Sequence, residues 1–209
     1  MDFSKAFDSI NHQLLLAKLK NYGVDQTTIC WLSSYLRGRR QRVRIGQEFA
    51  SSSIPVTSGV PPGSHIGPLL FIVFLEDLVR EVGESSCSVY AEDMKLHRVV
   101  KDEGDQAILQ DLLSRVHQWG DINDLHLNPK KCQVITYTRA RRSLTREYSI
   151  GTMRLKRVDL IRDLGVLLDS KLTLTAHIDT VIAKARATLG LVKFFCRGFN
   201  DPARYCTAL

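Results

Sequence analysis

The sequence predicts an α+β fold in which an antiparallel sheet carries helices on one face. Helical apolar stripes and short alternating segments follow one another without the regular strand–helix–strand repeat of a parallel sheet. Two short apolar runs flank a pair of acidic residues near the middle of the chain, a pattern that indicates a hairpin. A strongly apolar helix precedes this hairpin and is expected to pack behind the sheet.

Elements in the first part of the chain are predicted from apolar spacing and from the residues that end each element. Leucines recur at helical spacing from Leu14, and Gly23 ends that helix. Asp25 is a typical N-cap for the next helix, which Gly38 ends. The predicted elements are helices at 14–22 and 26–36, a strand at 41–45, a strand and a loop rich in Ser, Pro and Gly within 51–67, and an apolar helix at 68–82.

The remaining elements are predicted to complete the sheet and to add two further helices. Apolar residues from Ile108 to Val116 recur at helical spacing, which predicts an amphipathic helix packed on the sheet. A turn is expected at Gly151. The predicted elements are hairpin strands at 88–91 and 94–97, a helix at 107–119, a strand at 132–138, short strands within 147–168 and a helix at 175–195.

Composition excludes several classes of protein. The longest apolar run, Leu69 to Leu75, is too short to span a bilayer, and the start of the chain has no apolar leader. The five cysteines are scattered without a C-x-x-C pair, which argues against a disulfide framework or a zinc site. We therefore expect an intracellular protein, in the nucleus or the cytoplasm, that is not secreted and has no membrane partner.

The net charge of +7 is concentrated in two basic clusters. Such clusters suit a polyanion, most commonly a nucleic acid, although each cluster alone is equally compatible with a solvated basic face. The first cluster comprises Arg37, Arg39, Arg40, Arg42 and Arg44, and the second comprises Lys130, Lys131, Arg139, Arg141, Arg142, Arg146, Arg154, Lys156 and Arg157.

Glu92 and Asp93 lie between the two predicted hairpin strands. A two-residue hairpin loop usually holds Asn-Gly, Asp-Gly or Gly-Gly, because its central residues need positive φ. One interpretation is a solvated turn whose carboxylates face water. The other is that the turn holds carboxylates where a cation binds, since a dication between them makes adjacent like charges tolerable.

Four short blocks occur in a definite order along the chain. They read DFSKAFDSI from Asp2, SGVPPGSHIGPLLF at 58–71, YAED at 90–93 and LNPKKC at 127–132. In order and residue type these blocks resemble the reverse transcriptases of non-LTR retrotransposons of the LINE type, jockey-like or CR1-like. The resemblance implies a polymerase palm at 1–146, connecting strands at 147–169 and a partial helical thumb at 170–209, with the fingers absent.

The resemblance also implies an RNA-directed DNA polymerase that extends a DNA primer on an RNA template with deoxynucleoside triphosphates. In that reaction a 3′-hydroxyl attacks an α-phosphate in line, assisted by two Mg²⁺ ions about 3.5–4 Å apart. Mg²⁺ takes one or two carboxylates, with water and phosphate as its other ligands. Asp2, Glu92 and Asp93 correspond to the metal-binding acids of the family, and Mn²⁺ is the expected substitute for Mg²⁺.

Position within the matching blocks implies further roles. Phe7 corresponds to the aromatic residue that lies under the sugar and selects deoxynucleotides, although alone it also reads as a core aromatic. Lys131 corresponds to the catalytic lysine that neutralises or protonates the leaving pyrophosphate, although alone it also reads as a solvated charge. Pro61, Pro62 and Gly63 are expected at the nucleotide, Ser58 and Gly59 along the nucleic acid, and Arg37, Arg39, Arg40 and Arg42 at its phosphates.

Three features depart from the family pattern. Glu92 stands where the family has aspartate, and its extra methylene moves the carboxylate by about 1.5 Å. A misplacement of about 1 Å can cost on the order of a hundredfold in rate. Pro62 replaces the glutamine of Pro-Gln-Gly and removes an amide side chain and a backbone N–H. The chain also begins at the first metal ligand, Asp2, where fraying is expected, so we expect weak activity or none.

Two other functions stay open from the sequence. The second interpretation, after the polymerase, is a catalytically inactive retroelement remnant that binds RNA or an RNA–DNA hybrid through its basic surface. An RNA-dependent RNA polymerase palm shares the acidic hairpin, but Phe7, and Ala91 in place of glycine, count against it. The oligomeric state is open.

Overall fold

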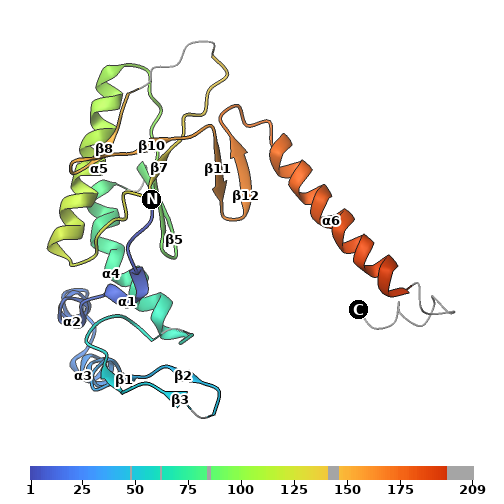
Figure 1. Cartoon of the computed structure of the whole chain (residues 1–209). Helices are drawn as coiled ribbons and strands as arrows, with labels where there is room; N and C mark the ends of the chain where they lie inside the picture. The colour runs from blue at the N-terminus through green and yellow to red at the C-terminus, as the bar shows by residue number, and fades with distance from the viewer. Residues whose placement is uncertain (48, 62, 84–85, 141–145, 197–209) are drawn as a thin grey trace. The chain divides into compact units, whose positions relative to one another are not determined.

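The computed structural model describes residues 1–47, 49–61, 63–83, 86–140 and 146–196 as helices combined with small antiparallel sheets (Figure 1). This confirms the predicted α+β class. The chain divides into two compact units, Met1–Val134 with Leu144–Lys156, and Ile135–Ser143 with Arg157–Leu209. The predicted boundaries of palm, connector and thumb stay predictions.

The strands that precede β11 in the chain form two-stranded pairs rather than one continuous sheet. The pairs are β1 with β4, β2 with β3, β5 with β6, β8 with β9, and β7 with β10. The helices are α1 (Ala6–Ser9), α2 (His12–Asn21), α3 (Gln26–Leu36), α4 (Ile66–Val82) and α5 (Glu103–Ile122). The strands are β1 (Arg40–Gln41), β2 (Arg44–Ile45), β3 (Phe49–Ala50), β4 (Ile54–Pro55), β5 (Cys87–Tyr90), β6 (Asp93–Leu96), β7 (Gln133–Val134), β8 (Ser149–Ile150), β9 (Met153–Arg154) and β10 (Lys156–Arg157).

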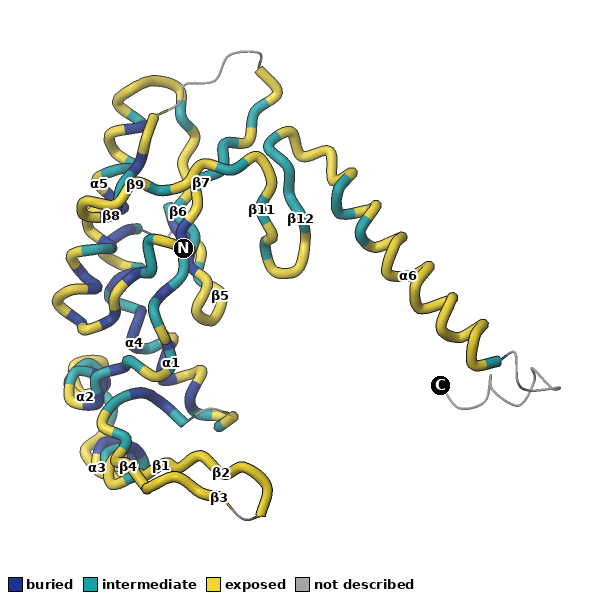
Figure 2. Tube along the Cα trace, in the orientation of Figure 1, coloured by how far each residue is buried: buried dark blue, intermediate teal, exposed yellow. Residues whose placement is uncertain are grey.

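Helix α4 forms the centre of the hydrophobic core, as its apolar sequence predicts (Figure 2). Phe71 and Phe74 on α4 are fully buried, and α2 and α5 pack against this helix. Trp119 of α5 meets Phe74 edge-on, with ring centroids 5.9 Å apart. The core therefore fixes α2, α4 and α5 to one another, and this scaffold supports the N-terminal segment of the chain.

Capping side chains set the helix starts. The Asn11 side chain accepts hydrogen bonds from the first-turn amides of α2, and the Asp25 side chain accepts one from Thr28 at the start of α3. Asp102 does the same for Asp105 N, at 2.9 Å, so α5 begins four residues before the predicted start at 107. Charged residues, for which apolar periodicity gives no signal, precede the apolar stripe there.

Two predicted strands are shorter than expected. The segment 41–45 is split between β1 and β2, because the Val43 N–H bonds the Ser51 side chain, at 2.9 Å, instead of a backbone carbonyl. Of the strand predicted over 132–138, only Gln133–Val134 is a strand. Ile135–Ser143 belong to the second unit, where the Thr138 N–H donates to the Ser170 carbonyl at 2.9 Å.

The acidic hairpin has a different register from the predicted one. Tyr90 pairs with Asp93, so the two-residue loop is Ala91–Glu92 and not Glu92–Asp93. Ala91 takes a positive φ of 50°, which supplies the turn geometry that glycine or asparagine usually provides. Asp93 is therefore the first residue of β6, with a side-chain direction set by the pleat of the strand.

The second unit contains a hairpin and a long helix. β11 (Leu160–Asp163) pairs antiparallel with β12 (Val166–Asp169), and α6 spans Thr175–Cys196. The Asp169 carboxylate accepts backbone N–H groups of Thr173 and Leu174, which fixes the turn before α6. The final helix predicted at 175–195 is confirmed. Across the described residues, no helix combines the length and the apolarity needed to cross a membrane.

Candidate active site

Asp2 lies in a short extended segment between the acidic hairpin and the segment around Leu127. It forms an antiparallel bridge with Asp93, and the next residue, Phe3, forms one with Leu127. The Asn128 N–H donates to the Asp2 carbonyl at 2.8 Å, and the Ser4 N–H donates to the carbonyl of the residue before Leu127, also at 2.8 Å. Burial of Phe3 anchors this segment in the core.

This pairing brings the predicted metal-binding acids together. Directly opposite residues of an antiparallel pair have side chains on the same face, with Cα atoms about 4.5–5.5 Å apart. Asp2 and Asp93 therefore present their carboxylates on one face, and Glu92 is the adjacent turn residue. Asp93 and Glu92 are exposed, so their oxygens are accessible to a ligand from solvent.

The carboxylate of Asp2 has one unsatisfied oxygen. Its Oδ1 atom is buried and has no hydrogen-bond partner, although the side chain as a whole is 31% exposed. The Lys131 ammonium lies 3.4 Å from this oxygen, an ion-pair contact without hydrogen-bond alignment. Because a buried carboxylate oxygen without a donor costs free energy, this atom is a favourable ligand for a cation.

The turn after Leu127 positions Lys131 at Asp2. The Asn128 carbonyl accepts the N–H groups of Lys131 and Cys132 at 3.0 and 3.1 Å, and the Asn128 side chain accepts the Lys130 N–H. Since Asn128 also binds the Asp2 backbone, the LNPKKC turn is fixed to the strand that carries the acid. Lys131 remains 64% exposed, so its ammonium can move between Asp2 and a ligand.

The described residues contain no cluster of three or more His, Cys, Asp or Glu side chains arranged to hold a metal ion. Asp2 and Asp93, with Glu92 next to them, can provide only part of a coordination sphere. That donor set suits a hard cation that keeps water or phosphate as its remaining ligands. It does not suit a structural zinc site, which needs four protein ligands.

Phe7 lies on α1 and stacks on Phe71, with ring centroids 4.7 Å apart and an interplanar angle of 28°. The ring is half-buried, which confirms that it packs on the core as the simpler interpretation expected. Its remaining exposed part is free for a ligand contact. Its role toward the sugar stays a prediction.

The loop Ser58–Pro61 is bound to the backbone of α1 and the residue after it. Gly59 N donates to Ile10 O, Val60 N donates to Phe7 O, and the Ser58 hydroxyl donates to the carbonyl of the residue after Phe7, each at 2.8 Å. Gly59 has a φ of +81°, and a Cβ atom there would lie 2.6 Å from the Cα of Asp8. Only glycine fits at this approach of two backbones.

The Gly59 carbonyl accepts two side-chain hydrogen bonds. His12 Nε2 lies 2.8 Å from it and Arg39 Nη2 lies 2.6 Å from it, while Arg39 Nε donates to Leu36 O. Sequence reasoning missed His12, because a histidine that follows a helix cap carries no distinguishing local signal. Arg39, predicted to bind phosphate, uses part of its guanidinium inside the chain.

After this loop, Pro61 accepts a hydrogen bond from the Ser64 hydroxyl at 2.8 Å, and that hydroxyl accepts the Gly67 N–H at the start of α4. Gly63 has a positive φ of 74° and is exposed. The loop is therefore bound at one end to α1 and at the other end to α4. The predicted nucleotide contact at Pro62 lies outside the described residues.

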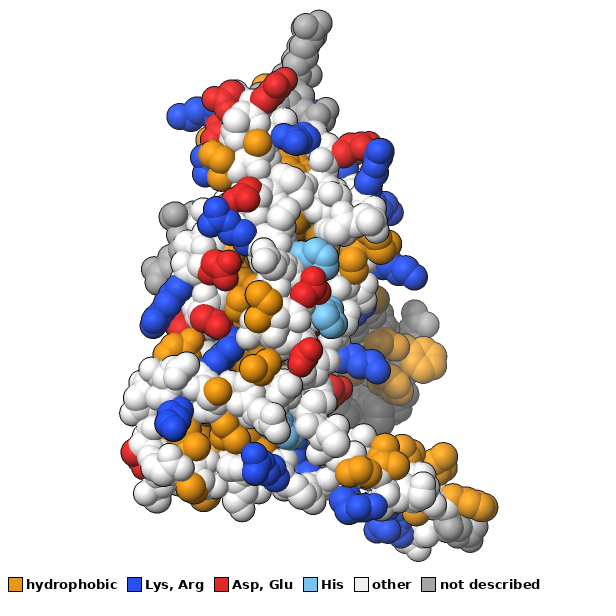
Figure 3. Space-filling view, turned by 90° about the vertical axis from the view of Figure 1, so that its left-hand side faces the viewer, with side chains coloured by type: hydrophobic (Ala, Val, Ile, Leu, Met, Phe, Trp, Pro, Cys, Tyr) orange, Lys and Arg blue, Asp and Glu red, His pale blue; other side chains and the backbone are white. Residues whose placement is uncertain are grey.

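The first basic cluster is spread over the end of α3 and the β1–β4 ribbon. The Arg40 guanidinium donates to the hydroxyl and the carbonyl of Ser53, whereas the side chains of Arg37 and Arg42 are exposed and form no hydrogen bond or ion pair with another described residue. Basic side chains gather with exposed apolar ones on the ribbon at the lower right of Figure 3. Phe49 and Ile45 are 71% and 72% exposed there.

Comparisons with known proteins show the family of the chain. Residues 1–177 match the family described as Reverse transcriptase (RNA-dependent DNA polymerase). The chain is 31% identical over 192 residues to the probable RNA-directed DNA polymerase from transposon X-element of Drosophila melanogaster, covering 90% of this chain and 21% of that protein. It is 30% identical over 191 residues to the RNA-directed DNA polymerase from mobile element jockey of the same species, covering 87% and 20%. The chain thus spans about a fifth of the length of these curated relatives.

Proposed function

The chain belongs to the reverse transcriptase (RNA-dependent DNA polymerase) family of non-LTR retrotransposons, and we propose that its site adds deoxynucleotides to a DNA primer on an RNA template by the two-metal route. The observation that carries this proposal is the bridge between Asp2 and Asp93. It joins two acids that are 91 residues apart in the sequence, which supports the proposal because two-metal chemistry uses carboxylates from neighbouring segments.

The donor set fits Mg²⁺. Asp2 and Asp93 face the same side, Asp2 Oδ1 lacks a hydrogen-bond donor, and water and phosphate can complete the coordination. Mg²⁺ bound there would activate the 3′-hydroxyl and stabilise charge on the transferring phosphoryl group. Mn²⁺ takes the same oxygen ligands and is proposed as its substitute.

Lys131 is proposed to act on the leaving pyrophosphate. Its ammonium lies 3.4 Å from Asp2 Oδ1, so it is already held at the acid around which the reacting phosphates gather. Because the side chain is largely exposed, the ammonium can leave Asp2 when a dication arrives and pair with a phosphate oxygen. It then neutralises the developing charge or donates a proton.

Phe7 and the Ser58–Pro61 loop are proposed to form the rigid wall of the nucleotide site. Phe7 stacks on the buried Phe71, so its ring is fixed from behind. Val60 binds the backbone of α1 at Phe7 and Gly59 binds the residue after α1, which holds the loop and Phe7 in a constant relation. A fixed aromatic surface excludes a 2′-hydroxyl by contact, which selects deoxynucleotides.

Primer extension with the whole chain tests the proposal. The assay uses an RNA template annealed to a DNA primer, with dNTPs and Mg²⁺ or Mn²⁺. We expect slow incorporation that Asp93→Asn abolishes and that ribonucleotides do not support. An exposed carboxylate in the first turn of α5, changed as Glu103→Gln, is the control and should leave incorporation unchanged.

The alternative is an inactive remnant that binds RNA–DNA hybrid, and the departures at Glu92 and Pro62 favour it. A gel shift without nucleotides separates the two functions. Binding without incorporation, in either metal, assigns the remnant function and rejects the polymerase. Absence of both binding and incorporation rejects both functions.

A further inference from the structure

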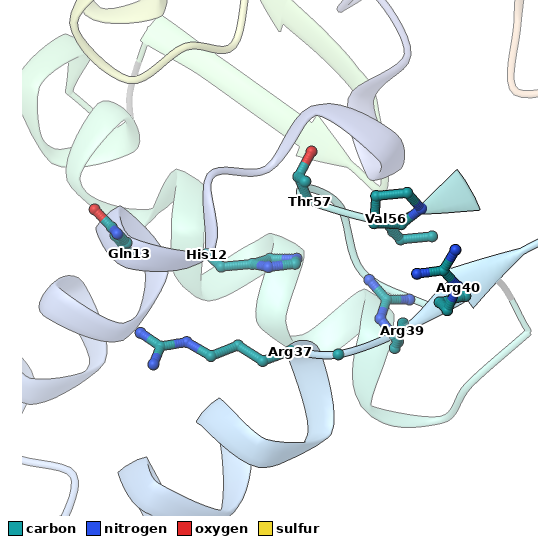
Figure 4. Close-up of a pocket in the computed structure, with 9 residues that line it drawn as sticks. His12, Gln13, Arg37, Arg39, Arg40, Val56 and Thr57 are labelled. Atoms are coloured by element: carbon teal, nitrogen blue, oxygen red, sulfur yellow. The ribbon is translucent and has the colours of Figure 1, made fainter. Parts of the chain in front are cut away.

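A pocket of about 500 Å³ lies beside the Gly59 loop (Figure 4). Its wall is formed by the start of α2, the turn from α3 into β1, and the residues that follow β4. The lining residues that matter here are His12, Gln13, Arg37, Arg39, Arg40 and Thr57. Three segments far apart in the sequence therefore build one concave surface.

The pocket is strongly basic. Three of its lining residues are arginines, and none of its lining residues, all of them described, is acidic. In Figure 4 the Arg37 side chain extends to one side, the side chains of Arg39 and Arg40 lie at the other, and the His12 ring lies between them. A guanidinium group that lines a concave basic surface favours an anion with several oxygens, such as phosphate.

The three arginines differ in how much of each guanidinium is free. Arg39 binds the carbonyls of Leu36 and Gly59, and Arg40 binds Ser53. The Arg37 side chain is exposed, and its guanidinium has no such bond to another described residue. Arg37 can therefore give all of its guanidinium donors to a ligand, whereas Arg39 mainly positions the Gly59 carbonyl.

A second pocket, of about 380 Å³, adjoins the first and shares His12, Gln13 and Thr57 with it. Its own lining is polar and mostly neutral, with Ser9, Asn11, Ser58 and a single acid, Asp124, which binds the Asn11 amide at 3.1 Å. The two pockets together run from a cationic end to a hydrogen-bonding end. A nucleic-acid strand, with a phosphate next to a sugar and a base edge, has this same sequence of groups.

We propose that the Arg37 pocket binds a backbone phosphate of the nucleic-acid strand and that the neighbouring pocket receives the adjoining nucleoside. The proposal rests on the proposed function for the identity of the ligand. Arg37 contacts the phosphate, and Arg39 is a positioning residue that links the pocket to the loop beside Phe7. A phosphate bound here thus holds the strand at the loop that is bonded to α1.

Fluorescence anisotropy of the whole chain with a labelled RNA–DNA hybrid that carries a single-stranded RNA overhang tests this. Arg37→Ala should weaken binding by about tenfold, the value of one charge-assisted hydrogen-bonding group of about 1.4 kcal/mol. Arg42→Ala removes the same charge from the same segment but outside the pocket, and should weaken binding by less than about threefold. Circular dichroism verifies that both variants fold, and Arg37→Lys should restore part of the affinity.

Equal losses for Arg37→Ala and Arg42→Ala would overturn the pocket, because the cluster would then act as a diffuse basic surface. Competition by dATP without metal, at the same molar phosphate as the RNA, should not displace the hybrid. If dATP displaces the hybrid from the unchanged protein but not from Arg37→Ala, the pocket binds a triphosphate, and the proposal is overturned. Since no step depends on incorporation, failure of primer extension leaves this test intact.

Discussion

Replacing Gly59 with alanine should destabilise the first unit strongly. An alanine Cβ would lie 2.6 Å from Asp8 Cα and 2.7 Å from Phe7 O, both backbone atoms, against the roughly 3.5–4.0 Å of an ordinary carbon contact. The positive φ adds about 1–2 kcal/mol, and overpacking adds about 1–3 kcal/mol. We expect a loss of about 2–5 kcal/mol, a large share of the roughly 5–15 kcal/mol that holds a domain folded.

Urea denaturation followed by circular dichroism measures this loss, with Gly23→Ala as the matched control. Gly23 has nearly the same φ, +84°, but no heavy atom lies within 4 Å of the position that an alanine Cβ would take there. The control should therefore lose only the conformational part, about 1–2 kcal/mol. If both variants lose the same free energy of unfolding, the close approach between the loop and α1 is not a steric constraint, and the reasoning fails.

Three further changes test other contacts. Burial lowers the pKa of Lys18, although its partner Asp77 acts in the opposite direction, so the folded state binds the Lys18 proton less tightly than the unfolded state does. The free energy of unfolding should therefore rise with pH between the lowered pKa and the ordinary pKa of lysine. Lys18→Met should remove this rise in urea titrations from neutral to alkaline pH. Ala91→Gly should raise the free energy of unfolding by about 0.5–1 kcal/mol, because it relieves the positive φ, and a loss would contradict the turn geometry. Lys131→Met should tighten Mn²⁺ binding by about two- to fivefold, because the ammonium no longer competes for Asp2. Electron paramagnetic resonance measures this binding. Unchanged or weaker binding would show that Lys131 does not occupy the cation position.

Helices were predictable because their signals are local. The spacing of the leucines, the cap Asp25 and the apolar run of α4 lie within a few residues of the structure they produce. The pairing of Asp2 with Asp93 had no such local signal, and only the resemblance of the ordered blocks to a known family led us to expect these acids together. The sequence pattern was sufficient to predict an element wherever its hydrogen bonds and caps come from residues close by in the chain.

Long-range features were not predictable in this way. The hydrogen bond from His12 to Gly59 joins residues 47 positions apart, and nothing in the local pattern marks either residue as its partner. The split of 41–45 depends on a serine hydroxyl from a later segment, at Ser51. The division of the Arg37–Arg44 cluster into a positioning residue and a free one likewise depends on where Leu36 and Gly59 lie in space.

Register in the acidic hairpin changes the meaning of Glu92. Asp93 pairs with Tyr90 and bridges to Asp2, so the direction of its carboxylate is fixed by two neighbouring strands. Glu92 lies in the exposed two-residue turn, where its longer side chain can adopt other rotamers and return its carboxylate toward the position that an aspartate would reach. The roughly hundredfold cost of a misplaced ligand is therefore an upper bound for Glu92. The same misplacement at Asp93 has no such compensation, because neighbouring strands fix the direction of that side chain. Asp93→Asn removes the charge while keeping the shape of the side chain, so loss of incorporation in this variant would show that the reaction depends on the Asp93 carboxylate.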